Sequence, residues 1–366
     1  MKLRIAILGT RGIPNHYGGY EQAVSFIGPG LAKKGHEVTV YNSQRHPYKE
    51  RQWNGVGIIH QKDPENSLGT AGQFIYDLNC IRHAARSSYD VWLMMGYTSS
   101  SVWGRLYPKQ PAIISHMDGL EWKRTKYAKP VRKFLQWAEK LAISHSDFFI
   151  ADSIAIQQLL EEKYGVQANY IPYGATIYEN DREDLVKEAG LIPYSYYLMV
   201  ARLEPENNIE TILDGFCQTN TSEKFVVTGN TQTSFGKRML RKFHAQKNIV
   251  FTGSIFDQEK LHTLKRYCRF YFHGHSVGGT NPSLLEAMAS QACIVAHDNP
   301  FNRAVTGKNA YYFNEADDVS AIIRTALRKE DMICNNLKKI VECYNWEKII
   351  DQYESLVKES YLQKRK

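Results

Sequence analysis

The sequence predicts an α/β protein built from two doubly wound domains, each containing a parallel sheet. Short β-branched runs alternate with amphipathic helical stretches along the chain, which is the pattern of strands joined by crossover helices. The length of 366 residues exceeds what one ordinary core accommodates. The alternation restarts after a polar, turn-rich segment at 171–184. We therefore expect domains at 1–175 and 176–345, with a final helix at about 346–366 that packs back on the first domain.

Each element is expected from its own local pattern. Apolar β-branched runs predict first-domain strands at 3–8, 37–41, 57–60, 91–95, 112–116, 148–151 and 169–171. Helical spacing predicts helices at 21–33, bent at Gly28-Pro29-Gly30, and at 130–144. In the second domain we expect strands within YYLMVAR, KFVVTGN, NIVFTGS, RFYFHG and CIVAHDN, and helices near 209–218, from Asp257, within PSLLEAMA and at about 346–362.

Composition indicates a soluble protein of the cytoplasm. Hydrophobic residues make up 43% and charged residues 23% of the chain, which is ordinary for a globular protein. No apolar run approaches the roughly 20 residues that span a bilayer, and the short apolar run near the N-terminus is typical of a first strand rather than a secretion signal. Six cysteines without a CxxC pair predict neither a disulfide framework nor a zinc site.

The net charge of +8 is concentrated in the first domain. Residues 1–175 carry 21 Lys and Arg against 14 Asp and Glu, and the remainder 25 against 24. Ligands of doubly wound domains bind beyond the carboxyl ends of the strands. Two such domains side by side are expected to face a cleft, so the loops after Leu8, Ile114, Val200 and Phe272 are the places to seek a site.

The stretch HGHSVGGTNPSLLEAMA, residues 273–289, follows one of these strands. Gly278 and Gly279 allow the backbone to approach a ligand closely. Asn281 suits a helix N-cap and Pro282 a first helical position, and the free N–H groups of a helix start favour phosphate. Glu286 lies one turn later and leans back, so we expect it to accept hydrogen bonds from sugar hydroxyls. The alternative is a solvated acid on an amphipathic helix.

A cation for the phosphate is expected in MVARLEPENN. Arg202 follows a strand of the second domain, and arginine binds phosphate through two parallel hydrogen bonds. Glu206 and Asn207 follow in a turn and are added to the expected ligand site. A surface salt bridge is the alternative for Arg202.

In the first domain, GTRGIPNHYGGYEQ follows the first strand and lacks the GxGxxG dinucleotide fingerprint. Gly18 and Gly19, which open a helix, either place N–H groups against a ligand or only turn the chain.

In IISHMDGLEWKR, His116 and Asp118 are expected to point toward the ligand. His116 either transfers protons and binds hydroxyl groups or has a structural role. His273 and His275 lack a third ligand at suitable spacing, so no metal site is predicted.

The segment at residues 122–140 interleaves basic and aromatic residues. Basic side chains near an anionic membrane contribute about 1 kcal/mol each, so weak docking on a membrane is expected, with a solvated helix face as the alternative. No nucleic-acid motif accompanies the segment. The residues expected to contact membrane or acceptor are Tyr17, Trp122, Lys123, Arg124, Lys126 and Lys133.

The co-ordered motifs resemble retaining glycosyltransferases of family 4, which have the GT-B fold. More narrowly, LGTRGIPNHYGGYE, HMDGLEWKR, ARLEPENN and HSVGGTNPSLLEAM are similar to the bacterial rhamnosyltransferase subgroup of cell-surface polysaccharide biosynthesis. The resemblance implies a nucleoside diphosphate sugar donor, dTDP-L-rhamnose, and a lipid-linked or growing saccharide acceptor at the inner face of the membrane. Two positions depart from the family. Gly278 replaces a glutamate that ordinarily contacts the donor sugar, and Asn207 replaces a lysine.

By this resemblance the first domain binds the acceptor and the second the donor, and Glu286 contacts the nucleotide ribose. No DxD motif is present, so we expect the helix start and Arg202 to stabilise the departing diphosphate without metal or another cofactor. The expected catalytic residues are His116, Asp118 and Arg202. The expected donor-binding residues are Gly18, Gly19, Arg202, Glu206, Asn207, His275, Gly278, Gly279, Thr280, Asn281, Ser283 and Glu286.

Two other functions remain open at this stage. An epimerase or hydrolase of nucleotide sugars on the same fold would consume donor without an acceptor. A non-catalytic nucleotide-binding module would bind nucleotide and turn over nothing. A dehydrogenase ranks last because the dinucleotide fingerprint is missing.

Overall fold

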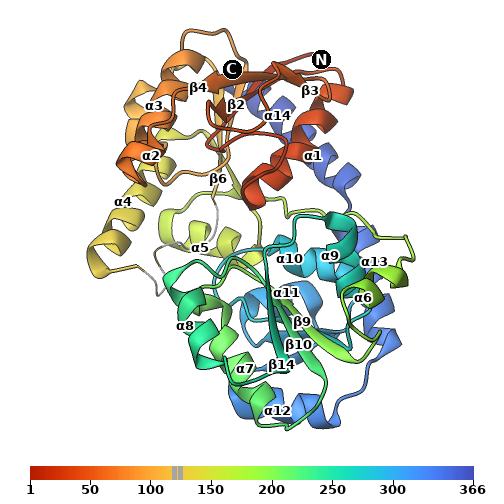
Figure 1. The fold of residues 1–366 in the computed structure, drawn as a ribbon. Helices are drawn as coiled ribbons and strands as arrows, with labels where there is room; N and C mark the ends of the chain where they lie inside the picture. Colours follow the sequence, from red (N-terminus) through yellow and green to blue (C-terminus); the bar gives the residue numbers. More distant parts are fainter. Residues whose placement is uncertain (118–121, 123–126) are drawn as a thin grey trace. The chain divides into compact units, whose positions relative to one another are not determined.

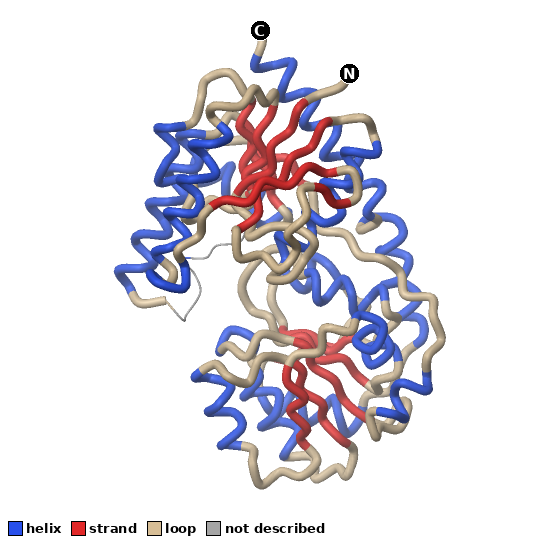
Figure 2. Tube along the Cα trace, turned by 45° about the horizontal axis from the view of Figure 1, so that its top comes forward, coloured by secondary structure: helices blue, strands red, loops and turns tan. Residues whose placement is uncertain are grey.

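The computed structural model describes residues 1–117, 122 and 127–366, which divide into two compact units. Among these residues, the first unit contains 1–117, 122, 127–173 and 346–366, and the second contains 174–345. The division lies two residues before the boundary expected from the turn-rich segment. Strands lie at the centre of each unit and helices around them (Figure 2).

The first unit contains an eight-stranded sheet in the order β3-β4-β2-β1-β5-β6-β7-β8. Neighbouring strands are parallel except β3 and β4. All seven predicted strands are present with ends within two residues of those expected, whereas the two-residue β3 is too short to show a pattern. The strands are β1 Arg4–Leu8, β2 Glu37–Ser43, β3 Gln52–Trp53, β4 Val56–Gln61, β5 Val91–Met94, β6 Ala112–His116, β7 Phe148–Ala151 and β8 Ala168–Tyr170.

Helices of the first unit come from both ends of the chain. They are α1 Gly19–Lys33, α2 Glu65–Leu68, α3 Ala71–Ala84, η1 Ser101–Leu106, α4 Lys129–His145, α5 Ile154–Tyr164 and α14 Trp346–Lys364. Helix α14 lies beside α1 (Figure 1). The rings of Phe26 and Trp346 stack 4.4 Å apart, and a Cβ at Gly30 would lie 2.5 Å from Ile350. The glycine therefore lets the two helices approach closely.

The second unit contains a six-stranded parallel sheet in the order β11-β10-β9-β12-β13-β14. Its strands are β9 Tyr196–Val200, β10 Lys224–Thr228, β11 Ile249–Gly253, β12 Phe270–His273, β13 Ile294–His297 and β14 Tyr311–Phe313. Its helices are α6 Glu183–Glu188, η3 Pro205–Asn207, α7 Ile209–Cys217, α8 Ser234–Lys242, α9 Gln258–Arg266, α10 Pro282–Ala289, α11 Pro300–Thr306, α12 Ala316–Thr325 and α13 Glu330–Cys343. The five predicted strands are confirmed, and only the three-residue β14 escaped prediction.

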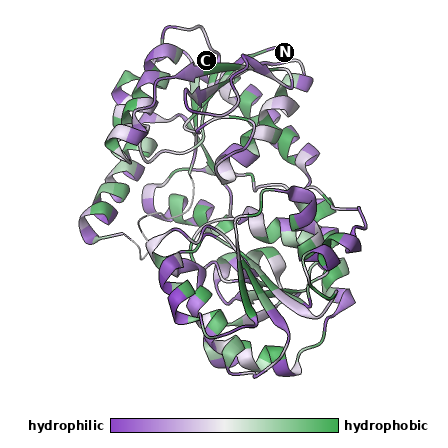
Figure 3. Ribbon diagram, in the orientation of Figure 1, coloured by the Kyte–Doolittle hydropathy of each residue, from purple (hydrophilic) through white to green (hydrophobic). Residues whose placement is uncertain are grey.

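The core of the second unit is aromatic. Tyr197 contacts the rings of Phe216, Phe225, Phe270 and Phe272 across neighbouring elements. The strands of this sheet are correspondingly hydrophobic (Figure 3). Because parallel strands end at one edge, the loops after β9, β12 and β13 lie next to one another. This edge carries most of the donor-binding residues expected from the sequence.

Candidate functional site

The loop that follows β12 is fixed to the turn that follows β9. The carbonyl of Gly274 accepts a hydrogen bond from Asn208 Nδ2 at 2.7 Å. Ser276 donates both its N–H, at 3.1 Å, and its hydroxyl, at 2.8 Å, to the carbonyl of Glu206. A Cβ at Gly274 would lie 1.9 Å from the carbonyl oxygen of Asn207. The glycine therefore permits direct backbone packing between the loop and η3.

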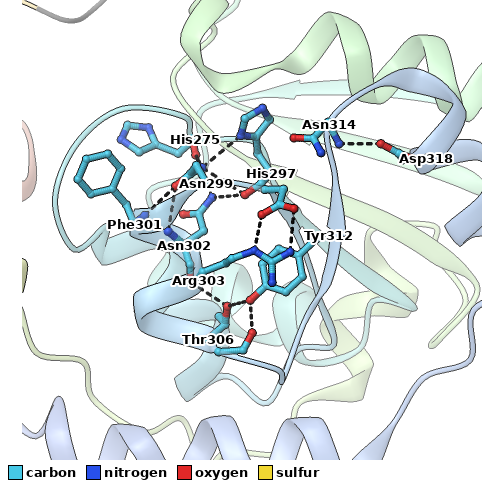
Figure 4. Close-up of polar contacts among 12 residues, drawn as sticks. His275, His297, Asn299, Phe301, Asn302, Arg303, Thr306, Tyr312, Asn314 and Asp318 are labelled. Atoms are coloured by element: carbon cyan, nitrogen blue, oxygen red, sulfur yellow. Dashed lines mark hydrogen bonds and ion pairs between the residues drawn. The ribbon is translucent and has the colours of Figure 1, made fainter. Parts of the chain in front are cut away.

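The start of α11 holds the same loop from the other side (Figure 4). Asn299 Nδ2 and Asn302 Nδ2 each donate to the carbonyl of His275 at 3.0 Å. The same two amides also donate to the carbonyl of His297, at 3.2 and 2.9 Å. Side-chain amides therefore link the loops that follow β9, β12 and β13, which are neighbours in the sheet. The backbone at His275 is held on both sides.

The side chain of His275 lies between Asn207 and Gly278. Its Nδ1 is 2.9 Å from Asn207 Oδ1, and Asn207 Nδ2 donates to the carbonyl of Arg202 at 2.7 Å. Both ends of the Asn207 amide therefore make hydrogen bonds within the second unit, and the amide links His275 to the backbone at Arg202. Gly278 has a φ of +137°, and a Cβ there would lie 2.9 Å from His275 Nε2.

Helix α10 begins where the sequence predicted, with Asn281 as N-cap and Pro282 as first residue. The expectation of free N–H groups in its first turn is wrong. The N–H of Ser283 donates to Asn281 Oδ1 at 2.9 Å, and those of Leu284 and Leu285 to the carbonyl of Asn281 at 3.0 and 3.2 Å. The cap thus satisfies the donors that a helix start usually leaves open.

The amides that remain available lie in the glycine pair before the helix. Within the described part of the chain, the N–H groups of Gly278 and Gly279 have no hydrogen-bond partner. Both groups lie close to the positive end of the α10 dipole, where an anion is stabilised. In this segment the donors that remain available to an anion are therefore these two amides rather than those of the first helical turn.

Glu286 forms an ion pair that the sequence analysis missed. Lys265 of α9 is fully buried and its Nζ lies 2.5 Å from Glu286 Oε2, while the Glu286 side chain is 17% exposed. The acid is therefore not a solvated surface residue. The Lys265–Glu286 pair has no net charge, so it would not repel a phosphate group nearby. Its carboxylate is still a strong acceptor of hydrogen bonds from hydroxyl groups.

The surroundings of this pair are also buried. His262 stacks on Tyr178 with ring centres 5.3 Å apart, and its Nδ1 lies 2.7 Å from the hydroxyl of Ser290. Burial, followed by the charge of Lys265, lowers the pKa of His262 to about 4. His262 is therefore neutral near neutral pH and adds no second positive charge beside Lys265.

The other expected donor residues divide into exposed and buried positions. Arg202 is exposed, and among the described residues no carboxylate lies within ion-pair distance of it, so the salt-bridge alternative is not observed. The Ser283 hydroxyl lies 2.6 Å from that of Tyr271 and donates to the carbonyl of Val200 at 3.3 Å, so it supports the sheet edge. Thr280 and Glu206 are 4% and 5% exposed.

In the first unit, the loop after β1 is held by side chains from neighbouring elements. Asn42 exchanges two hydrogen bonds with the backbone of Ile13, at 3.0 and 2.8 Å. The N–H of Arg11 donates to the buried carboxylate of Glu21 at 2.8 Å, and the Arg11 guanidinium lies 4.2 Å from the ring centre of Tyr17. Tyr17 itself is 63% exposed.

The glycine pair of this loop starts α1. Gly18 is its N-cap, in an extended conformation and without a side-chain cap, and Gly19 is the first helical residue. His116 ends β6 and is 1% exposed. Its ring centre lies 5.4 Å from that of Tyr20 and 5.8 Å from that of Tyr173. His116 is therefore enclosed by aromatic rings at the carboxyl edge of the first sheet.

Helix α4 is anchored by a buried acid that lies within the basic segment at 122–140. Glu139 is 2% exposed and accepts hydrogen bonds from Lys163, Tyr164 and Trp122 at 2.6, 2.5 and 3.0 Å. Trp122 is half-buried, and Lys163 lies 4.7 Å from the centre of its ring. Trp122 thus contacts a charged pair of the first unit.

Lys133 lies on the exposed side of α4. Asp118, Lys123, Arg124 and Lys126 lie outside the described residues. Within the residues that the structure describes, no helix is long and apolar enough to cross a membrane, and no group of three or more His, Cys, Asp and Glu side chains is arranged to hold a metal ion.

The structure closely matches solved structures that are distant in sequence. Sucrose-phosphate synthase from Thermosynechococcus elongatus aligns with a TM-score of 0.82 at 15% identity, over 99% of this chain and 100% of the other. HepE from Anabaena in complex with UDP-glucose aligns at 0.76 and 16% identity, over 98% and 100%. The chain has the GT-B fold. Trehalose-6-phosphate synthase from Burkholderia multivorans shares the GT-B fold at a TM-score of 0.73 and 11% identity, over 99% of both chains.

Family models match two segments of this GT-B chain. Residues 181–342 match the model described as Glycosyl transferases group 1, and residues 101–176 match a domain of unknown function, DUF1972. No curated protein matches the sequence. The match of residues 181–342, together with the GT-B fold, supports a glycosyltransferase.

Proposed function

We propose that the protein is a retaining glycosyltransferase that transfers L-rhamnose from dTDP-L-rhamnose to a lipid-linked or growing saccharide. One observation carries the proposal. The segment that matches the Glycosyl transferases group 1 model contains Arg202, the glycine pair at Gly278 and the acid Glu286 at one edge of a parallel sheet. These groups provide the functions that binding of a nucleotide sugar requires: a cation, backbone donors and an acceptor for hydroxyl groups.

The diphosphate is bound by the loop and by Arg202 in this proposal. The N–H groups of Gly278 and Gly279 donate to phosphate oxygens, and the exposed guanidinium of Arg202 neutralises the charge that develops as the sugar–phosphate bond breaks. The Lys265–Glu286 pair presents a carboxylate oxygen to the nucleoside hydroxyls without adding net negative charge. These residues stabilise the leaving group without a metal ion.

Retention is proposed to proceed on one face of the sugar. The departing phosphate oxygen takes the proton of the acceptor hydroxyl as the new bond forms, so no side chain serves as a nucleophile. His116 and Asp118 are proposed to assist at the sugar and acceptor hydroxyls. The first unit, with Gly18, Gly19 and Tyr17, is proposed to bind the acceptor.

The exposed face of α4 supports docking of the first unit on the inner face of the cytoplasmic membrane. Trp137 and Val131 are 47% and 40% exposed, and Lys129, Lys133 and Lys140 lie exposed on the same helix. The only acid of α4, Glu139, is buried, so each exposed charge of this helix is positive. Basic and aromatic side chains of this kind bind anionic lipid surfaces.

The test is nucleotide release from a panel of nucleotide sugars, including dTDP-L-rhamnose and UDP-glucose, with and without membrane lipid extracts that carry saccharide acceptors. The proposal expects release from dTDP-L-rhamnose that depends on the extract. Release that ignores the extract identifies an epimerase or hydrolase, and binding without turnover identifies a nucleotide-binding module. Turnover only with UDP-glucose would disprove the assignment of the donor.

A further inference from the structure

We infer that Arg11 positions the ring of Tyr17 as a surface on which one sugar unit of the acceptor saccharide stacks. The inference rests on the proposed function, because it assumes that the first unit binds a saccharide acceptor. It adds a positioning role for Arg11 that the proposed function does not require, and it assigns Tyr17 to the acceptor rather than to the membrane.

The side chain of Tyr17 is held in place although most of it is exposed. It is 63% exposed, and the Arg11 guanidinium lies over its ring, 4.2 Å from the ring centre. The N–H of Tyr17 donates to Asn15 Oδ1 at 3.1 Å. A side chain that is already held loses less conformational entropy when a ligand binds to it. The ring of Tyr17 is therefore an exposed aromatic surface that is organised before a ligand arrives.

The residue that holds this ring is itself fixed at its backbone and at its side chain. The N–H of Arg11 donates to Glu21 at 2.8 Å, and its carbonyl accepts from the Ser43 N–H at 3.1 Å. Its guanidinium donates to both carboxylate oxygens of Glu65, with Nη2 3.0 Å from Oε1, and to Gln73 Oε1 at 3.4 Å. A planar guanidinium bound to both oxygens of a carboxylate has one orientation, so it determines the plane of the aromatic ring that it covers.

The groups around the ring favour a saccharide over a lipid chain. Asn15 and His16, which precede Tyr17 in the chain, are exposed and polar, and the Glu65 side chain beside Arg11 is 29% exposed. A pyranose has an apolar face of C–H groups and a rim of hydroxyl groups, so it suits an aromatic ring with hydrogen-bonding groups close by. Lipid chains require a contiguous apolar surface instead.

The experiment separates the ring from its support with three variants. Tyr17→Phe keeps the ring, Tyr17→Leu removes it from an exposed position, and Arg11→Met removes the guanidinium. Nucleotide release from dTDP-L-rhamnose, or from UDP-glucose if wild type uses only that donor, is measured against the amount of membrane lipid extract. These curves give the half-saturating amount of extract and the maximal rate. Calorimetry gives the dissociation constant of the donor, and thermal melting checks the fold.

A matched control lies in the second unit. The ring of Tyr194 is 45% exposed and lies 5.0 Å from the guanidinium of Arg328. Tyr194 precedes β9, so it lies at the edge of the second sheet that is opposite to the donor-binding loops. Tyr194→Leu therefore removes a similar ring without affecting a proposed ligand site, and it should leave the half-saturating amount of extract unchanged.

We expect Tyr17→Leu to raise the half-saturating amount of extract about tenfold, the loss of one stacking contact, and Tyr17→Phe to change it less than about twofold. Arg11→Met should raise it about threefold. The double variant Arg11→Met/Tyr17→Leu should behave like Tyr17→Leu, because Arg11 acts through the ring. The maximal rate and the dissociation constant of the donor should change less than about twofold in all of these variants.

Three results would overturn the inference: an unchanged half-saturating amount in Tyr17→Leu, an equal rise in Tyr17→Phe, or additive effects of the Arg11 and Tyr17 changes. Weaker sedimentation of Tyr17→Leu with phosphatidylglycerol vesicles that carry no saccharide would also overturn it, by assigning the ring to the membrane. If Arg11→Met does not fold, Arg11→Lys, which keeps the charge but not the planar group, takes its place with the same expectation. Absence of extract-dependent release from wild type would instead reject the proposed function itself.

Discussion

Helices α10 and α1 both begin at or shortly after a glycine pair, and their starts are held by different means. Helix α10 follows Gly278-Gly279 and is capped by the Asn281 side chain, and its acid is paired with buried Lys265. Helix α1 begins at Gly19, has Gly18 as N-cap without a side-chain cap, and packs on α14 through the stacked rings of Phe26 and Trp346. The same sequence signal therefore accompanies a helix start with a side-chain cap in one unit and a helix start without one in the other.

The largest expected change in stability comes from replacing Lys265, the partner of Glu286 in α10. Lys265→Met should lower the free energy of unfolding by about 3 kcal/mol, because it removes the buried cation whose Nζ lies 2.5 Å from the Glu286 carboxylate. Lys242→Met is the matched control: Lys242 pairs with Glu210 and Asp214 but is 37% exposed, so its loss should cost less than about 1 kcal/mol. Urea denaturation measures both.

The Lys265→Met/Glu286→Gln double variant should be more stable than Lys265→Met alone, since it also removes the carboxylate charge that Lys265 balances in wild type. Its affinity for dTDP should stay low, because a neutral amide replaces the carboxylate. Equal stability of wild type and the single variant would contradict the pair's role as the anchor of α10.

Acid should weaken the anchoring of α10 through His262. The pKa of His262 is lowered to about 4, mainly by burial, whereas an unfolded histidine titrates near 6.5. As pH falls from about 6.5 to about 4, the unfolded state binds a proton that the folded state does not. The free energy of unfolding should therefore decrease by at most about 3 kcal/mol over this window, and it should be unaffected by this group above pH 6.5.

Urea denaturation of wild type and His262→Gln at pH 5 and pH 7.5 measures this contribution. The variant should show a smaller difference between the two pH values than wild type. A difference of the same size in both proteins would assign the acid sensitivity to other groups.

The two glycine pairs should tolerate alanine differently. Gly278→Ala should cost about 2 kcal/mol and displace His275, because φ is +137° and the Cβ would lie 2.9 Å from Nε2. Gly18 has a φ of −163°, which any residue adopts, so Gly18→Ala should cost well under 1 kcal/mol. Thermal melting and donor kcat/KM compare the pair, and similar losses in both variants would remove the distinction between the loops.

The smallest expected effect concerns the caps. Asn281→Ala should cost about 1 kcal/mol by removing the bond to the Ser283 N–H. Gly18→Ser supplies a capping hydroxyl to α1 and should stabilise the protein by a few tenths of a kcal/mol. Urea denaturation resolves the first change; a larger effect at Gly18 than at Asn281 would reverse the comparison.

The positions of the strands and the start of α10 were accessible from the sequence because they follow from local patterns. Strands such as β6 and β7 were predicted to the residue, and the Asn-Pro start of α10 was confirmed. The occupied first-turn amides of α10 were not foreseen, because the sequence indicates a capping residue but not which N–H groups it satisfies. The role of Asn207 depends on β9 and β12 being neighbours, which is a tertiary fact.

Two charged anchors did leave a signal in the sequence. Lys265 shares helical spacing with Leu261, Leu264 and Cys268, and Glu139 shares it with Leu135, Ala138 and Ala142. A charge at an apolar position of a helix is almost never fully buried without a partner. Reading these two residues by helical face, rather than by the charge of the surrounding segment, would have identified both as buried.

The placement of α14 has a consequence for how this chain is made. Residues 346–366 belong to the first unit although the whole second unit precedes them in the sequence. During translation, residues 174–345 of the second unit leave the ribosome as one uninterrupted stretch, whereas the first unit waits for residues 346–366 before α1 gains its stacking partner. Of these two units, the one whose synthesis begins earlier is therefore completed later.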